Sequence, residues 1–126
     1  MKLNVDCIRD LLLYFEENLD PNDSYQMEFN ELPSYSSQDI YYCTIQLLDA
    51  GFIDGKNHAI KSSFPLITVN RITWNGHEFL DNIRPKTIWD KTKNIGQELK
   101  TNSIDSLFKI SSAVITEIIK HNLGYI

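Results

Sequence analysis

A strand that runs straight into a capped helix is the feature that most constrains this chain. Residues 66–72 are rich in β-branched side chains, which favours a strand. Thr73 follows at once, and its hydroxyl can cap a helix that begins at Trp74. Two residues further on, Gly76 lets the first turn of that helix approach a neighbouring backbone closely. The sequence therefore predicts a strand at 66–72 that meets a helix at 74–83.

The segments before this joint supply the rest of a small mixed fold. A strand at 57–61, connected through residues 62–65, predicts a β-hairpin with the strand at 66–72. Residues 25–29 alternate apolar and polar side chains, which indicates a short strand with one buried face. Residues 4–19 predict a helix whose apolar stripe packs on a core and consists of Ile8, Leu11, Leu12, Phe15 and Leu19.

Both ends of the middle helix can be predicted from the side chains around them. Ser36 can cap the N–H of Asp39 while the Asp39 carboxylate reaches back. Gly51 stands where a left-handed residue is needed, and Phe52 can fold back onto Leu47. A helix over 37–50 is therefore expected. Its periodicity predicts an inward face of Ile40, Tyr41, Thr44, Ile45, Leu47 and Leu48 and an outward face of Gln38, Asp39, Tyr42, Gln46 and Asp49.

Two more helices are expected at the C-terminal end. Pro85 suits the first position of a helix over 86–95, and Gly96 suits its end. Ser103 can cap the last helix, which Gly124 follows. Apolar residues cover much of its circumference, so we expect burial on several sides, and a second copy of the chain is a candidate for one of them.

Composition bounds the class of protein. A chain of 126 residues is large enough for one domain with its own core. Cys7 and Cys43 show no C-x-x-C spacing, which indicates free, buried thiols in a reducing compartment. The longest apolar run is too short for a signal segment or membrane span, so a soluble, cytoplasmic protein with no membrane partner is expected. Residues 1–55 hold two basic and eleven acidic side chains, whereas residues 56–126 hold ten and six.

The element order helix, strand, helix, hairpin, helix is that of a winged-helix domain. One departure is the short space at residues 31–35, where such domains have a further helix. We therefore expect a single α+β domain over 1–126, with a winged-helix-like core at 1–84 and a C-terminal helical extension at 85–126.

Three segments carry a resemblance to a known family: "TWNGHEFLDNIR", "IRDLLLYFEENL" near the start and "LLDAGFI" at the end of the middle helix. Together they resemble an uncharacterised family of small bacterial and prophage-encoded proteins, a domain of unknown function. The resemblance implies a winged-helix-like fold and a link to mobile elements. It brings no activity, cofactor or catalytic residue.

The polar residues of this motif raise the question of catalysis. A zinc-binding helix needs two His one turn apart, and His77 has only Asp81 at that spacing. Neither His58 nor His121 stands in a ligand motif. We favour His77 and Glu78 as stabilisers of a helix start, with no metal, no cofactor and no enzymatic activity. Trp74 and Trp89 can each stack on a base, but core packing is the preferred interpretation.

Two kinds of partner remain open. In the first hypothesis the chain binds DNA: Gln38, Tyr42 and Gln46 touch bases, and Lys56, Lys61 and Arg71 touch phosphates. Against this, residues 30–55 hold no Lys or Arg, although cations drive phosphate binding. In the second hypothesis the same scaffold binds another protein. The sequence predicts a non-catalytic binding module, with DNA-linked regulation slightly ahead of protein interaction.

Overall fold

The computed structural model describes residues 2–58 and 65–124. The chain forms two compact units, Met1–His77 and Glu78–Ile126, and the boundary falls inside helix α3 (Trp74–Ile83). The following paragraphs take each unit by itself. Among the helices of the described residues, none has the length and apolar character that a membrane span requires.

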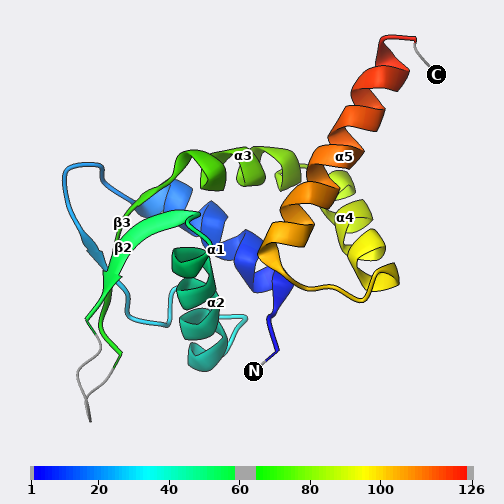
Figure 1. The fold of residues 1–126 in the computed structure, drawn as a ribbon. Coiled ribbons are helices and arrows are strands. Elements are labelled where there is room, and N and C mark those ends of the chain that lie inside the picture. The colour runs from blue at the N-terminus through cyan, green and yellow to red at the C-terminus, as the bar shows by residue number, and fades with distance from the viewer. Residues whose placement is uncertain (1, 59–64, 125–126) are drawn as a thin grey trace. The chain divides into compact units, whose positions relative to one another are not determined.

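Unit 1 contains two helices and a small sheet, followed by the first turn of α3 (Figure 1). The elements are α1 (Val5–Asn18), β1 (Tyr25–Gln26), α2 (Ser37–Asp49), β2 (Ile53–Asn57) and β3 (Ile67–Ile72). A mixed α+β fold with the predicted element order is thereby confirmed. The bounds predicted for the helix at 74–83 are also those observed for α3.

The sheet is antiparallel and has the strand order β1-β3-β2. Tyr25 pairs with Val69, and on the other side of β3 the pairs run from Ile53↔Ile72 to Asn57↔Ile67. The prediction of a strand at 57–61 is wrong about its start, because β2 already begins at Ile53. The chain turns so tightly after α2 that the strand follows at once. Residues 59–61 of that prediction lie outside the described residues.

The core of unit 1 forms where α1, α2 and β3 pack together. Helix α1 contributes the predicted stripe: Ile8, Leu11, Leu12 and Phe15 are buried, and Leu19 is half-buried. From the other elements come Met27, Ile40, Cys43, Leu47, Ile53, Ile67 and Val69, all buried. The alternation predicted for residues 25–29 is also confirmed, although only Tyr25 and Gln26 pair as a strand.

Unit 2 contains the rest of α3, together with α4 (Lys86–Glu98) and α5 (Ile104–Asn122). Gly96 does not end α4 as predicted but lies within it, buried. A Cβ at this position would come within 3.2 Å of a Leu107 methyl group, so Gly96 lets α4 and α5 pack closely. The left-handed residue after α4 is Lys100 instead, with φ of 57°.

Helix α5 starts as predicted, because the Ser103 hydroxyl accepts a hydrogen bond from the Ser106 N–H at 3.0 Å. Within a single chain, burial does not extend to the second half of the helix. Ile104, Leu107 and Val114 are buried, but Ile118, Ile119 and Leu123 are exposed. The apolar character of α5 thus exceeds what unit 2 covers.

Candidate functional site

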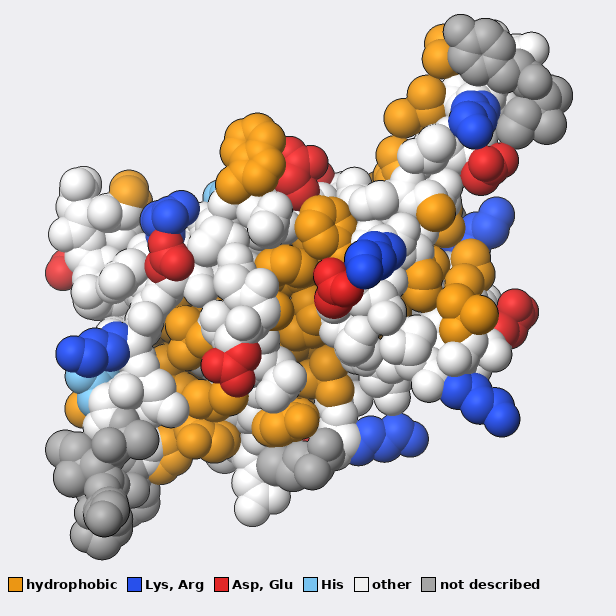
Figure 2. Space-filling view, viewed as in Figure 1, with side chains coloured by type: hydrophobic (Ala, Val, Ile, Leu, Met, Phe, Trp, Pro, Cys, Tyr) orange, Lys and Arg blue, Asp and Glu red, His pale blue; other side chains and the backbone are white. Residues whose placement is uncertain are grey.

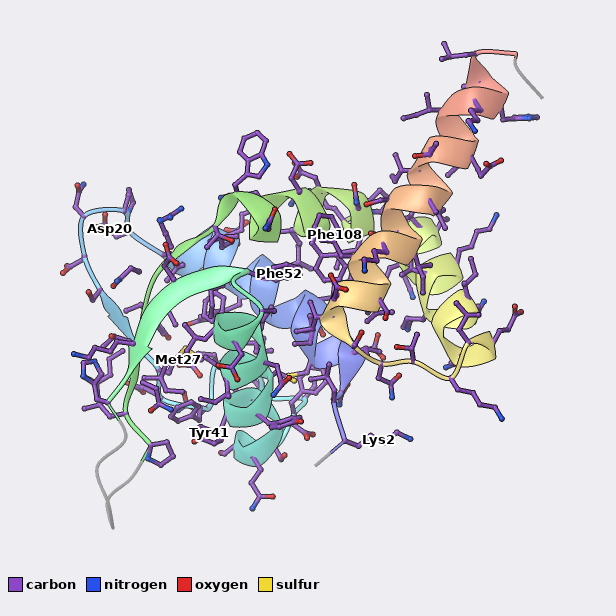
Figure 3. The ribbon with its side chains drawn as sticks, viewed as in Figure 1. Lys2, Asp20, Met27, Tyr41, Phe52 and Phe108 are labelled. Carbon is purple, nitrogen blue, oxygen red and sulfur yellow. The ribbon has the colours of Figure 1, made fainter. Side chains whose placement is uncertain are left out.

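Helix α2 is fixed at both ends by the local chemistry that the sequence predicted. At the start, the Ser36 Oγ accepts a hydrogen bond from the Asp39 N–H at 3.1 Å. At the end, Gly51 has φ of 77°, and the N–H groups of Gly51 and Phe52 donate to the carbonyls of Leu48 and Leu47. These two hydrogen bonds reverse the direction of the chain, and β2 begins directly after the turn. Figure 3 shows Tyr41 on α2 and Phe52 at this turn.

The three α2 residues proposed to touch bases are unequal in exposure. Gln38 is exposed, whereas Tyr42 and Gln46 are half-buried. Of the residues predicted to face inward, Ile40, Thr44 and Leu47 are buried, and Tyr41, Ile45 and Leu48 are only half-buried. The inward list also missed Cys43, which is fully buried. The charged residues of α2 are Asp39 and Asp49.

The hairpin cations divide into three cases. Lys56 lies on β2 and is exposed. The Arg71 guanidinium forms an ion pair with the Asp54 carboxylate across the hairpin at 2.6 Å. Lys61 lies outside the described residues. Within the described part of the proposed DNA-binding surface, one of the two cations is therefore matched by an acid on the neighbouring strand.

A groove of about 480 Å³ lies beside α2 and the outer side of β2. We call it the α2–β2 groove, and it is lined by Ile45, Leu48, Asp49, Ile53, Asp54, Gly55 and Asn57. Its charged groups are both carboxylates. Figure 2 shows hydrophobic side chains gathered over this part of unit 1. The groove is therefore mainly polar and acidic, with Ile45 and Leu48 as its apolar side chains on α2. The sequence prediction missed it because the strand was placed four residues too late.

The joint between the hairpin and α3 has the geometry that the sequence predicted. The Thr73 hydroxyl accepts a hydrogen bond from the Gly76 N–H at 3.1 Å and donates one to the Gly51 carbonyl at 2.6 Å. The Thr73 N–H donates to the Phe52 carbonyl at 3.0 Å. A Cβ on Gly76 would overlap with that same carbonyl oxygen. The joint thus holds the end of α2 and the start of β2 in place, and with them the α2–β2 groove.

His77 and Asp81 have ordinary surroundings for helix residues. The His77 side chain is exposed and borders a cavity of about 160 Å³ whose other lining includes Phe15, Glu16, Leu19, Arg71 and Ile72. The Asp81 carboxylate pairs with the Arg84 guanidinium at 2.9 Å. No three His, Cys, Asp or Glu side chains in residues 2–58 and 65–124 are grouped so that they can hold a metal ion.

The two tryptophans behave differently. Trp89 is 2% exposed, as the core-packing interpretation predicted. Trp74 is 76% exposed, so the same interpretation is wrong for it. Trp74 is three and four residues before the exposed His77 and Glu78 and shares their face of α3, whereas the buried Leu80 and Ile83 lie on the other side of the helix. The buried residues of α3 are instead Gly76, Phe79, Leu80 and Ile83.

The two cysteines are free and fully buried, as predicted. The Cys43 thiol donates a hydrogen bond to the Asn4 carbonyl at 3.5 Å, which places it against the first turn of α1. A hydrogen bond with Cys43, together with burial, raises the pKa of the Cys7 thiol. A protonated thiol is a poor nucleophile, so Cys7 is a packing residue of the α1–α2 contact.

The chain belongs to a family whose model covers most of its length. Residues 2–103 match the family described as Hypothetical protein (DUF2513), which confirms the resemblance to an uncharacterised family. An uncharacterized protein of Haemophilus influenzae (strain ATCC 51907 / DSM 11121 / KW20 / Rd) is 28% identical over 120 residues, which is 94% of this chain and 99% of the relative. No solved structure matches.

Proposed function

We propose that unit 1 is a winged-helix-like, non-catalytic module that binds another protein through the α2–β2 groove. The order of its elements and the strand order β1-β3-β2 support the winged-helix-like description. In that arrangement α2 takes the place of the recognition helix, and the paired strands β2 and β3 take the place of the wing. Function does not follow from this likeness, so it must be argued from the surface.

The observation that carries the proposal is the charge of this surface. On α2 and β2 the acidic residues are Asp39, Asp49 and Asp54, and the basic residue is Lys56. DNA phosphates would therefore meet mostly carboxylates, and binding to phosphate depends on cations. A protein surface with basic and apolar side chains would instead be attracted by these carboxylates. The α2–β2 groove thus favours a protein partner over DNA.

Capture of partners with matched charge variants tests the proposal. Immobilised wild-type protein is compared with Asp49→Lys, which reverses a groove charge, and with Asp105→Lys, which reverses an exposed charge of unit 2. We expect a protein retained by the wild type and Asp105→Lys but lost from Asp49→Lys. Equal retention by all three would place the binding surface elsewhere and would contradict the proposal.

We also propose that the second half of α5 associates with a second copy of the chain. Its exposed Ile118, Ile119 and Leu123 lie on one side of the helix. An antiparallel pair centred near Ile119 sets Glu117 of each copy close to Lys120 and His121 of the other. Light scattering should give a mass that rises with concentration and falls to that of the monomer in Ile119→Asp. A monomer mass at every concentration would exclude this association.

A further inference from the structure

The outer side of β2 is a free strand edge beside the α2–β2 groove. In the order β1-β3-β2, β2 pairs with β3 on one side and ends the sheet on the other. Its residues Ile53, Asp54, Gly55 and Asn57 line the groove. An edge strand presents backbone N–H and C=O groups that can pair with another extended chain. The groove therefore combines a strand edge with the side chains of α2.

The edge of β2 is unbroken over its five residues. The register passes from Asp54↔Arg71 to Gly55↔Val69, so the extra residue of this bulge is Asn70, on β3. A Cβ on Gly55 would overlap with the Thr68 carbonyl oxygen, so only glycine fits there. The space that a Gly55 side chain would need is taken by the backbone of β3, so glycine is required here for the pairing of β2 with β3. The outer edge of β2 contains no extra residue and can pair with an incoming strand.

The groove also lacks a cation of its own. Asp49 is in the last turn of α2, where the helix carries partial negative charge and has no basic residue. Asp54 adds a second carboxylate, although Arg71 neutralises part of its charge. Next to these acids are the half-buried Ile45 and Leu48. The matching ligand has a basic side chain near an apolar one.

We propose that the α2–β2 groove binds an extended peptide segment of a partner protein, which adds to β2 as a fourth strand. An apolar side chain of the segment packs on Ile45 and Leu48, and a Lys or Arg side chain reaches Asp49. Pairing with the strand edge supplies affinity, and the two side-chain contacts supply selectivity. This inference rests on the proposed protein-binding function and names the chemistry of the partner.

A second copy of the chain fits the same edge less well. Two antiparallel β2 strands centred on Gly55 would set Asp54 against Lys56 of the copy, which is favourable. The side chains on the α2 side would be Ile53, Gly55 and Asn57 of the copy, because strand residues alternate. Its Ile53 is already buried in its own core, so a polar Asn57 would face the groove. Each Asp49 would also stay without a cation.

Backbone methylation of a probe peptide tests strand addition directly. The probe is an eight-residue fluorescent peptide with two Lys-Lys-Val-Val repeats, so that each face of the extended chain carries both lysine and valine. Two further versions carry N-methyl groups on alternate amides in opposite phase. One phase blocks the N–H groups that pair with β2, and the other blocks those that face away. We expect one phase to weaken binding more than tenfold and the other less than threefold. Equal binding of both versions, or no binding of the unmodified probe at millimolar concentration, would overturn the proposal.

Protein variants locate the bound probe. Asp49→Asn should weaken binding several-fold and reduce its dependence on salt, whereas Asp105→Asn, in unit 2, should change neither. Amide hydrogen exchange should slow in residues 53–57 and stay unchanged in β1, the other edge of the sheet. Unchanged exchange in β2, or full binding by Asp49→Asn, would overturn the proposal. Partner capture that depends on Asp49 while both methylated probes bind equally would leave the protein-binding function standing without strand addition.

Discussion

At the scale of single residues, Gly76 is where α3 comes closest to the backbone of the hairpin. Its missing side chain leaves room for the Phe52 carbonyl, which in turn accepts the Thr73 N–H. Gly51 differs, because a Cβ there would meet open space although its φ is positive. The two glycines are therefore required for different reasons, one for space and one for conformation.

Replacement of each glycine by alanine distinguishes the need for space at Gly76 from the need for a positive φ at Gly51. Gly76→Ala should lower the free energy of unfolding by about 3 kcal/mol, because the new methyl group must push apart two backbone segments. Gly51→Ala should cost only about 1 kcal/mol, the penalty of a left-handed alanine. Urea denaturation of both variants measures the difference. A smaller loss for Gly76→Ala than for Gly51→Ala would contradict the close approach.

A second residue-scale feature is a chain of hydroxyl groups near β1. The Tyr25 hydroxyl bonds with the Tyr14 hydroxyl at 2.6 Å and donates to the Glu31 carboxylate at 3.1 Å. Burial, followed by the bond with Tyr14, raises the pKa of Tyr25. Burial and the bond to Asp10 likewise raise the pKa of Tyr35. Both phenols therefore favour the protonated form in the folded state.

The raised pKa values predict how stability depends on alkaline pH. An unfolded tyrosine ionises near pH 10, whereas Tyr25 and Tyr35 stay protonated in the folded protein to higher pH. Their contribution is thus complete below about pH 10 and is lost as the pH rises above it. Thermal unfolding of the wild type should show this decline, and Tyr25→Phe combined with Tyr35→Phe should reduce its slope. An equal slope in the double variant would contradict the assignment.

At the scale of elements, Thr73 connects the end of α2 to the start of α3. Its hydroxyl takes part in two hydrogen bonds, one to the Gly51 carbonyl and one from the Gly76 N–H. The position of α2 relative to the hairpin, and hence the shape of the α2–β2 groove, depends on this contact.

Substitution of Thr73 tests the contact. Thr73→Ala removes the cap and leaves the Gly51 carbonyl without this donor, so we expect a loss of about 2 kcal/mol in the free energy of unfolding. Thr73→Ser keeps the hydroxyl and serves as the control, with an expected loss below about 1 kcal/mol. Chemical denaturation distinguishes the two. Equal stability of the alanine and serine variants would show that the hydroxyl contributes little.

Helix ends were predictable in this chain because their chemistry is local. The caps at Ser36, Thr73 and Ser103 and the turn at Gly51 all involve hydrogen bonds between residues at most five positions apart. The start of β2 was not predictable in the same way. Asp54 and Gly55 are typical turn residues, and only pairing with β3 makes them a strand.

Burial was harder to predict where it depends on contacts distant in sequence. Gly96 was expected to end α4, yet it lies inside the helix, where close packing of Leu107 favours a residue without a side chain. Trp74 was expected in the core and is exposed. The α2–β2 groove could not be predicted from the sequence, because its acidic lining combines Asp49 of a helix with Asp54 of a strand. No spacing in the sequence indicates that the two carboxylates line the same groove.

At the scale of the whole molecule, the uneven charge of the chain can be assigned to particular helices and strands. Of the seventeen acidic residues, eleven lie in residues 1–55, which include α1, β1 and α2. Such a surface repels nucleic acid and attracts basic partners. The family match includes this region and continues to residue 103. Unit 1 is therefore the binding module that we propose, and the exposed half of α5 is a separate proposed contact surface.

The most direct test of this account is a titration of the purified protein with fluorescently labelled duplex DNA, followed by anisotropy at low salt. Because Asp39, Asp49 and Asp54 outnumber the basic side chain of Lys56 on α2 and β2, we predict no binding at protein concentrations of tens of micromolar. Binding that weakens steeply as salt rises, and that is lost on charge reversal of Lys56, would contradict the central claim that this surface recognises protein rather than DNA.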